Sequence, residues 1–134
     1  MAEKNVELVR EVNAVFNEAP GAIERWMPYY ARDAEFHMPP EWPEGRVYRG
    51  HDGIRALANA WIGSFDEYRW DEERLIDESD CVVALWHHRG RARGTNVWVE
   101  RQIGSVWYLR DGKVTKVLAF FSWAEALEAA GLRE

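Results

Sequence analysis

The sequence has little cysteine and no long apolar run. Cys81 is the only cysteine among 134 residues, so no disulfide can form within the chain and we expect a reducing compartment. No apolar stretch approaches the roughly 20 residues of a membrane-spanning helix. The N-terminus, Met-Ala-Glu-Lys-Asn, lacks the apolar core of a signal peptide. These absences predict a soluble cytoplasmic protein.

Positive charge is also in short supply. Lysine and arginine total 17 against 23 aspartate and glutamate, which gives a formal net charge of −6. A general nucleic-acid-binding surface needs an excess of positive charge to meet phosphates, so this class of protein is excluded. The one basic run, Arg89, Arg91 and Arg93, alternates along the chain and indicates the solvated side of a strand.

Motifs for the common cofactor and metal chemistries are missing. No Gly-rich loop follows a predicted strand, and no serine stands in a nucleophile elbow. His87 and His88 are adjacent, and successive side chains of a strand point to opposite faces, so they cannot bind one ion together. No cysteine or carboxylate beside them has ligand spacing. We therefore expect neither a metal ion nor a cofactor.

Tryptophan, by contrast, is abundant. The chain is 47% hydrophobic, which suits one globular domain spanning residues 1–134 with a real core. One small core rarely needs eight large indole rings, so we expect some of them to line a cavity or a subunit contact. The eight are Trp26, Trp42, Trp61, Trp70, Trp86, Trp98, Trp107 and Trp123.

The C-terminal half predicts three long antiparallel strands, Cys81–Arg93, Asn96–Arg110 and Lys113–Ser122. Gly94 lies at the first turn, and an Asp-Gly pair at residues 111–112 favours a tight hairpin at the second. Strands of this length must curve, and a curved sheet has a concave face. The segments that precede these strands are expected to cover that face.

The first half predicts helices. Apolar residues share one stripe over residues 3–18, which Pro20 and Gly21 end. A second helical stretch begins near Ala22, and Pro28 within it predicts a kink. A third helix with a wide apolar face is opened by Asp52 and Gly53.

The remaining segments complete an α+β arrangement with the helices on one face of the sheet. Two further strands are predicted at Asp33–Met38 and over residues 66–77, and a capping box at Ser122 starts a helix over Ala124–Ala130. Residues 41–50 form an irregular loop that contains Trp42. A loop that carries an apolar ring is a candidate lid or rim of a pocket.

Five segments of the chain resemble one known family. They are YARDAEF (30–36), YRGHDGIR (48–55), GRARG (90–94), WYLRDGKV (107–114) and AEALEAAGL (124–132). The chain resembles the SnoaL-like family of the nuclear-transport-factor-2-like superfamily, which includes ketosteroid isomerases and polyketide cyclases. The resemblance implies a cystatin-like cone, in which N-terminal helices pack on the concave face of a curved antiparallel sheet around a deep pocket. It also implies a homodimer joined through the outer sheet faces.

The catalytic groups of those enzymes are missing from the matching positions of this sequence. The position of the general-base aspartate of ketosteroid isomerases matches Met38, and that of the oxyanion-hole acid matches Gly104, before Val106. The tyrosine of the first helix has no counterpart within residues 1–20, and Ser122 stands where related cyclases often have aspartate. The steroid isomerase mechanism is therefore set aside.

His88 is the best candidate for acid/base chemistry. If Ala84, Trp86 and His88 share the concave face, His88 reaches the pocket, and the unperturbed pKa of histidine lies near neutrality. Tyr30 is the candidate for a hydrogen bond to a substrate oxygen. The alternative is a core histidine that bonds a neighbour and does no chemistry.

An aromatic-rich set is expected to bind a hydrophobic small molecule, with plain core packing as the alternative. Small residues at Ala84, Gly104 and Ala119 would leave room for it, while Trp98 and Trp107 point outward to a dimer contact. The expected ligand-binding residues are Trp26, Phe36, Met38, Trp42, Trp61, Phe65, Trp86, Val117, Ala119 and Phe121.

The sequence is consistent with three hypotheses of function. The first is a SnoaL-like enzyme that isomerises, cyclises or hydrates a hydrophobic substrate without a cofactor, with His88 moving the proton. The second is a non-catalytic ligand-binding or accessory protein that uses the same pocket. The third is a domain whose main role is dimeric assembly.

Overall fold

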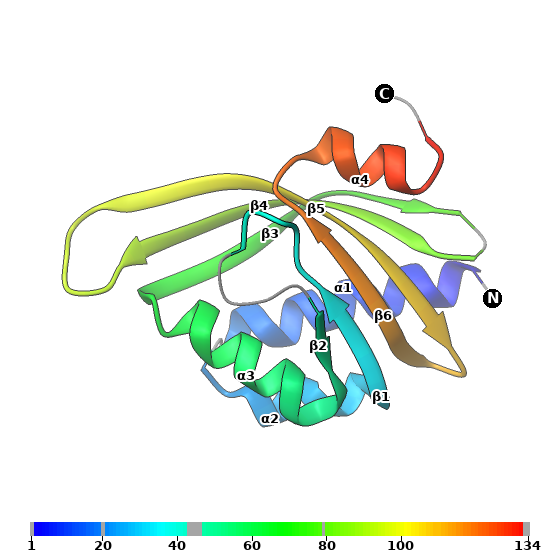
Figure 1. The fold of residues 1–134 in the computed structure, drawn as a ribbon, viewed down its shortest axis with the longest axis horizontal. Coiled ribbons are helices and arrows are strands. Elements are labelled where there is room, and N and C mark those ends of the chain that lie inside the picture. Colours follow the sequence, from blue (N-terminus) through cyan, green and yellow to red (C-terminus); the bar gives the residue numbers. More distant parts are fainter. Residues whose placement is uncertain (1, 20, 43–46, 79, 133–134) are drawn as a thin grey trace.

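The computed structural model describes residues 2–19, 21–42, 47–78 and 80–132. Helices α1–α3 cover the concave face of a curved sheet, as predicted, and α4 packs on the opposite face (Figure 1), so the helices do not all share one side. The predicted α+β fold class is confirmed. The elements are α1 (Ala2–Glu18), α2 (Ile23–Trp26), β1 (Tyr30–His37), β2 (Val47–Arg49), α3 (Gly50–Ile62), β3 (Phe65–Asp77), β4 (Val82–Ala92), β5 (Trp98–Arg110), β6 (Lys113–Phe120) and α4 (Trp123–Ala129).

The six strands form one sheet in the order β2-β1-β6-β5-β4-β3. All neighbouring pairs are antiparallel except β1 with β6, which is parallel, so the sheet is mixed. The three predicted C-terminal strands are present as β4, β5 and β6 in consecutive antiparallel pairing. These three strands form the middle of the sheet and contribute Trp86, His88 and Ser105 to the cavity side.

The breaks in the first half follow the prolines. Helix α2 ends at Trp26, and a single 3₁₀ turn (Met27–Tyr29) with Pro28 inside it leads into β1, which confirms the predicted kink. Strand β2 lies within the segment expected to be an irregular loop. Residues 43–46 of the expected lid, and Pro20 at the expected end of the first helix, lie outside the described residues.

Helix α1 docks onto the edge strand β3. Val9, Val12 and Phe16 are buried on its apolar face. Asn17 donates a hydrogen bond to the carbonyl oxygen of Trp70 (2.8 Å) and accepts one from its backbone N–H (3.0 Å). The free backbone edge of β3 is thus paired at the residue whose ring enters the interior. No helix in the described ranges has the length and apolarity to cross a bilayer.

Residues 103–107 of β5 are buried on both faces, and this corrects two predictions. Ser105 and Trp107 face the α1–α3 side, while Val106 packs with α4. Gly104 also faces α4, because a Cβ atom added there would lie 2.5 Å from the Cβ of Ala126. Gly104 therefore does not face the pocket, and Trp107, expected to point outward, is only 2% exposed.

Candidate functional site

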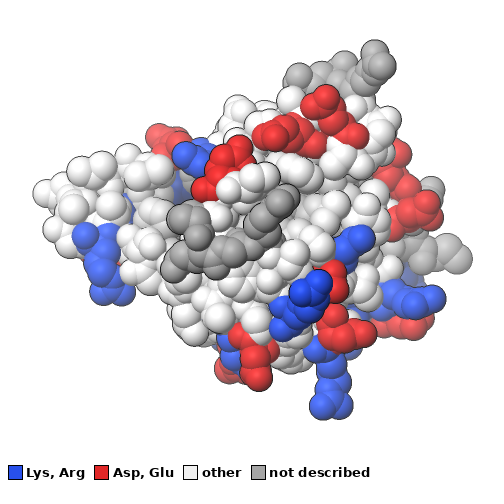
Figure 2. Space-filling view, in the orientation of Figure 1, with Lys and Arg blue, Asp and Glu red and all other residues white. Residues whose placement is uncertain are grey.

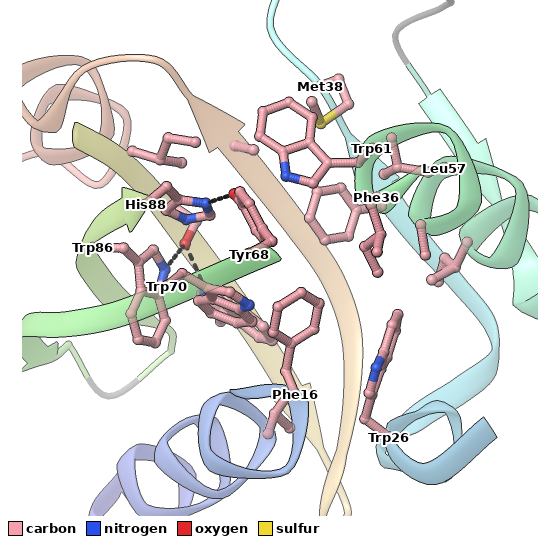
Figure 3. Close-up of a pocket in the computed structure, with 18 of the residues that line it drawn as sticks. Phe16, Trp26, Phe36, Met38, Leu57, Trp61, Tyr68, Trp70, Trp86 and His88 are labelled. Carbon is pink, nitrogen blue, oxygen red and sulfur yellow. Dashed lines mark hydrogen bonds between the residues drawn. The ribbon is translucent and has the colours of Figure 1, made fainter. Parts of the chain in front are cut away.

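A cavity of about 120 Å³ lies between the concave face of the sheet and helices α1–α3 (Figure 3). Its wall is almost wholly apolar and rich in aromatic rings. A cavity of roughly 150 Å³ with such a wall accommodates one benzene molecule. The space therefore suits one small ring in this state of the protein.

The structure brings most of the predicted site residues together around this cavity. Those that line it are Trp26, Tyr30, Phe36, Met38, Trp61, Trp86, His88, Ala119 and Phe121.

Three residues predicted to bind a ligand lie outside the lining. Trp42 packs against Trp61 with ring centroids 5.3 Å apart and donates its indole N–H to the hydroxyl of Tyr48. Phe65 stacks on Tyr68 with ring centroids 4.8 Å apart, behind the cavity wall. Val117 is fully buried in the core.

Eleven of the described lining residues were not predicted as site residues, and four of these have polar side-chain groups: Tyr68, Trp70, Ser105 and Trp107. Tyr68 and Trp70 alternate with charged Glu67, Arg69 and Asp71 in β3. This period-two pattern is a sequence signal for two inward-facing rings. Ser105 and Trp107 have no such signal, because residues on both sides of them are buried as well.

His88 enters the cavity from β4 between aromatic rings. Its ring stacks on Trp70, its cross-strand partner, with centroids 5.6 Å apart, and meets the edge of Trp61. Burial lowers the pKa of His88 to about 3, so the imidazole is neutral at pH 7. Nδ1 is hydrogen-bonded to the hydroxyl of Tyr68 (Figure 3), whereas Nε2 is buried and has no partner in the described part of the chain.

The hydrogen bond to Tyr68 assigns the tautomer of His88. Burial raises the pKa of Tyr68, so its hydroxyl is protonated. His88 Nδ1 is the only hydrogen-bond partner of that hydroxyl in the described part of the chain, so the hydroxyl donates to Nδ1. A neutral imidazole that accepts at Nδ1 carries its hydrogen on Nε2, so His88 offers the cavity a hydrogen-bond donor.

The other polar groups of the wall are also rich in donors. The Ser105 oxygen accepts hydrogen bonds from the indole nitrogens of Trp86 (2.8 Å) and Trp107 (2.7 Å). The indole N–H of Trp26 is buried without a described partner. Burial raises the pKa of Tyr30, whose hydroxyl therefore stays protonated at the wall.

Charged groups are absent from the described lining, which contains no carboxylate, lysine or arginine. Within the described ranges, no three His, Cys, Asp or Glu side chains gather in a way that could hold a metal ion. The arrangement can hold a neutral apolar ring and donate hydrogen bonds to its oxygen.

A match to a known domain family agrees with this fold. The SnoaL-like domain matches residues 9–117, which is most of the chain. The chain belongs to the SnoaL-like domain family. The resemblance noted in the sequence is thereby confirmed. No curated protein sequence matches the chain.

Solved structures of other proteins share the SnoaL-like chain's fold. Bal32a, from a soil-derived mobile gene cassette, is 20% identical with a TM-score of 0.78 over 90% of both chains. TerC, co-crystallised with polyporic acid, is 23% identical with a TM-score of 0.75 over 96% of this chain and 98% of its own. A Catenulispora acidiphila protein with a ketosteroid isomerase-like fold, in complex with trimethylamine, is 14% identical with a TM-score of 0.69 over 91% and 93%.

Proposed function

We propose that this SnoaL-like protein binds a small, neutral, hydrophobic compound by a carbonyl-type oxygen and promotes isomerisation, cyclisation or hydration without a cofactor. The observation that carries the proposal is the buried Nε2 of His88, which has no hydrogen-bond partner in the described part of the chain and belongs to a cavity wall that is almost wholly apolar. Membership of the SnoaL-like family supports a role of the isomerase or cyclase type. Tyr30 is proposed as a second group that hydrogen-bonds the oxygen.

The chemical role of His88 follows from its neutral state. When a carbonyl compound loses an α-proton to water, or gains water as a nucleophile, negative charge develops on its oxygen. Water has this part here because the described lining contains no carboxylate or lysine to act as the base. A fixed N–H donor in a dry site binds that oxygen more strongly as the charge grows, and such donors typically contribute about 10²–10³ in rate. His88 held by Tyr68 meets this requirement without changing its own charge.

Substitutions at His88 test the proposal with cyclohexanone as the probe. Glutamine can accept from Tyr68 and donate into the cavity, as the Nε2–H tautomer does, whereas phenylalanine can do neither. We expect His88→Gln to keep cyclohexanone binding and His88→Phe to weaken it roughly five-fold, the worth of one hydrogen bond. Calorimetry measures the affinity, and exchange of the α-hydrogens in D₂O, followed by NMR, measures catalysis. Adjacent His87, which faces outward, supplies the control His87→Gln.

The result separates enzyme from binder. Exchange at least about 10²-fold faster than with free imidazole, lost in His88→Phe, supports the enzyme. The absence of a carboxylate from the described lining favours the second candidate, a non-catalytic binder. Binding that depends on His88 with exchange no faster than in free imidazole would establish that candidate instead. Equal affinity in the wild type and His88→Phe contradicts both.

We also propose that the protein forms a homodimer through the outer face of the sheet. Trp98 is 44% exposed there, beneath the guanidinium of Arg89, and Val97 just before the strand is exposed as well. Figure 2 shows few charged side chains at this β4–β5 end of the molecule. Large exposed apolar residues on a charged protein favour an interface.

The dimer is tested by Trp98→Glu, which places a carboxylate at the proposed contact. We expect the wild type to sediment as a dimer in analytical ultracentrifugation and the variant as a monomer, because an unpaired charge in an interface costs several kcal/mol. Glu128→Gln, on exposed α4, is the control. A monomeric wild type, or a dimeric Trp98→Glu variant, would contradict the proposal.

A further inference from the structure

The cavity contains a second buried donor that the proposed function does not use. Trp26 is 5% exposed, and its indole N–H has no partner in the described ranges. It comes from α2, whereas His88 comes from β4, and Figure 3 shows the two on opposite sides of the cavity. Phe16 on the cavity wall packs against both Trp26 and Trp70, with ring centroids 5.9 Å and 5.1 Å apart. The two donors are therefore well separated.

Leaving two donors buried and unpaired is costly. Each unpaired polar group costs about 1–3 kcal/mol, and native proteins avoid such groups except where another requirement keeps them. An ordered water needs two to four polar partners, and each of these N–H groups is surrounded mainly by aromatic carbon. A water molecule at either position would thus be weakly held and readily displaced by a better acceptor.

The other polar groups of the cavity wall limit which kind of hydrogen-bond acceptor a ligand can bring. The Ser105 oxygen already accepts two indole N–H groups, so its hydroxyl hydrogen is a further donor. No cation in the described lining could neutralise a carboxylate or a phosphate. An alcohol would bring additional donors into a wall that already has more donors than acceptors. Carbonyl oxygens on an apolar ring fit, because they accept hydrogen bonds, donate none and carry no charge.

We infer that the ligand is a neutral cyclic diketone, with one oxygen bound by His88 Nε2–H and the other by the indole N–H of Trp26. The inference rests on the proposed function and adds a specificity-determining residue on α2 to it. Trp26 recognises the end of the ligand remote from His88. A compound with one carbonyl fills only one of the two sites.

The test compares diketones with matched monoketones. The probes are cyclohexane-1,4-dione against cyclohexanone, and the longer decalin-2,6-dione against decalin-2-one, because the two lengths cover different donor separations. Affinities are measured by calorimetry for the wild type, Trp26→Phe and the control Trp42→Phe, whose indole N–H is already bonded to Tyr48 outside the cavity. A ¹⁵N spectrum reads the indole N–H of Trp26 directly in the wild type.

For each pair of probes we compare the ratio of the dione's affinity to the monoketone's affinity. We expect this ratio, for at least one pair, to be roughly five-fold larger in the wild type than in Trp26→Phe. Trp42→Phe should keep the wild-type ratio, and the dione but not the monoketone should shift the Trp26 indole resonance downfield. If both ratios are the same in Trp26→Phe as in the wild type, or the resonance does not move, the inference fails. Cyclohexanone binding that still depends on His88 would then leave the proposed function standing, whereas no binding of any probe would overturn both.

Discussion

A Ser105→Ala variant is expected to lose roughly 2–6 kcal/mol of its free energy of unfolding, because the change leaves two buried indole N–H groups without an acceptor. Ser105 is 3% exposed, and its oxygen lies 2.8 Å from Nε1 of Trp86 and 2.7 Å from Nε1 of Trp107. Both indoles are almost completely buried, so water cannot replace the lost acceptor. Urea denaturation followed by circular dichroism measures the loss.

The hydrogen bonds, rather than the volume of the side chain, carry this expected effect. Ser105→Thr keeps the oxygen and should lose less than Ser105→Ala. In a Trp107→Phe background only one N–H is left unpaired, so Ser105→Ala should cost about half as much there. Exposed Ser64, whose hydroxyl donates a hydrogen bond to the carbonyl oxygen of Ala60, supplies the control Ser64→Ala. A loss at Ser105 no larger than at Ser64, or one that is independent of Trp107, would contradict this account.

Much of the fold could be predicted because its signals are local. Gly94 and Gly112 both have positive φ, at 74° and 76°, and they mark the turns of the β4–β5–β6 meander. Ser122 accepts a hydrogen bond from the backbone N–H of Glu125, as the capping box predicts. Each of these features depends on a few neighbouring residues, so the sequence alone contains the information.

The site could be predicted only in part, because its inner face depends on what covers the sheet. The phase of β4 was correct, and His88 lines the cavity with Trp86. In β5, α4 buries Gly104 and Val106 on one face while the cavity uses Ser105 and Trp107 on the other. An apolar run with both faces covered shows no alternation, and an error of one residue turns every side chain to the wrong side.

An error in the facing direction of a strand also makes its hydrogen-bonded side chains impossible to predict. Ser105 links two tryptophans that are distant in sequence, and Tyr68 reaches His88 from the neighbouring strand. These pairs form only when strand register and facing direction are both known. The sequence therefore predicts an aromatic pocket with a histidine, but it does not reveal that the wall is dominated by hydrogen-bond donors.

Mild acid is expected to destabilise the fold through His88. In the unfolded chain this histidine titrates near its ordinary pKa of 6.5, whereas burial lowers the pKa in the folded protein to about 3. As the pH falls below 6.5, His88 becomes protonated in the unfolded state but stays neutral in the folded state. The contribution of neutral His88 to the free energy of unfolding is therefore complete above pH 6.5. It is lost toward pH 3, at about 1.4 kcal/mol per pH unit. Between pH 7 and pH 5 the loss should be about 2 kcal/mol.

His88→Gln should abolish this loss, because the amide does not titrate and still fits between Tyr68 and the cavity. His87→Gln should keep this loss, since the exposed side chain of His87 lies outside the cavity and leaves His88 unchanged. Urea denaturation of the three proteins at pH 7, 6 and 5 gives the comparison above the range in which most carboxylates titrate. Equal losses in the wild type and His88→Gln would show that the imidazole can be protonated in place. Its Nε2 would then not be the neutral donor on which the binding of a ketone oxygen depends.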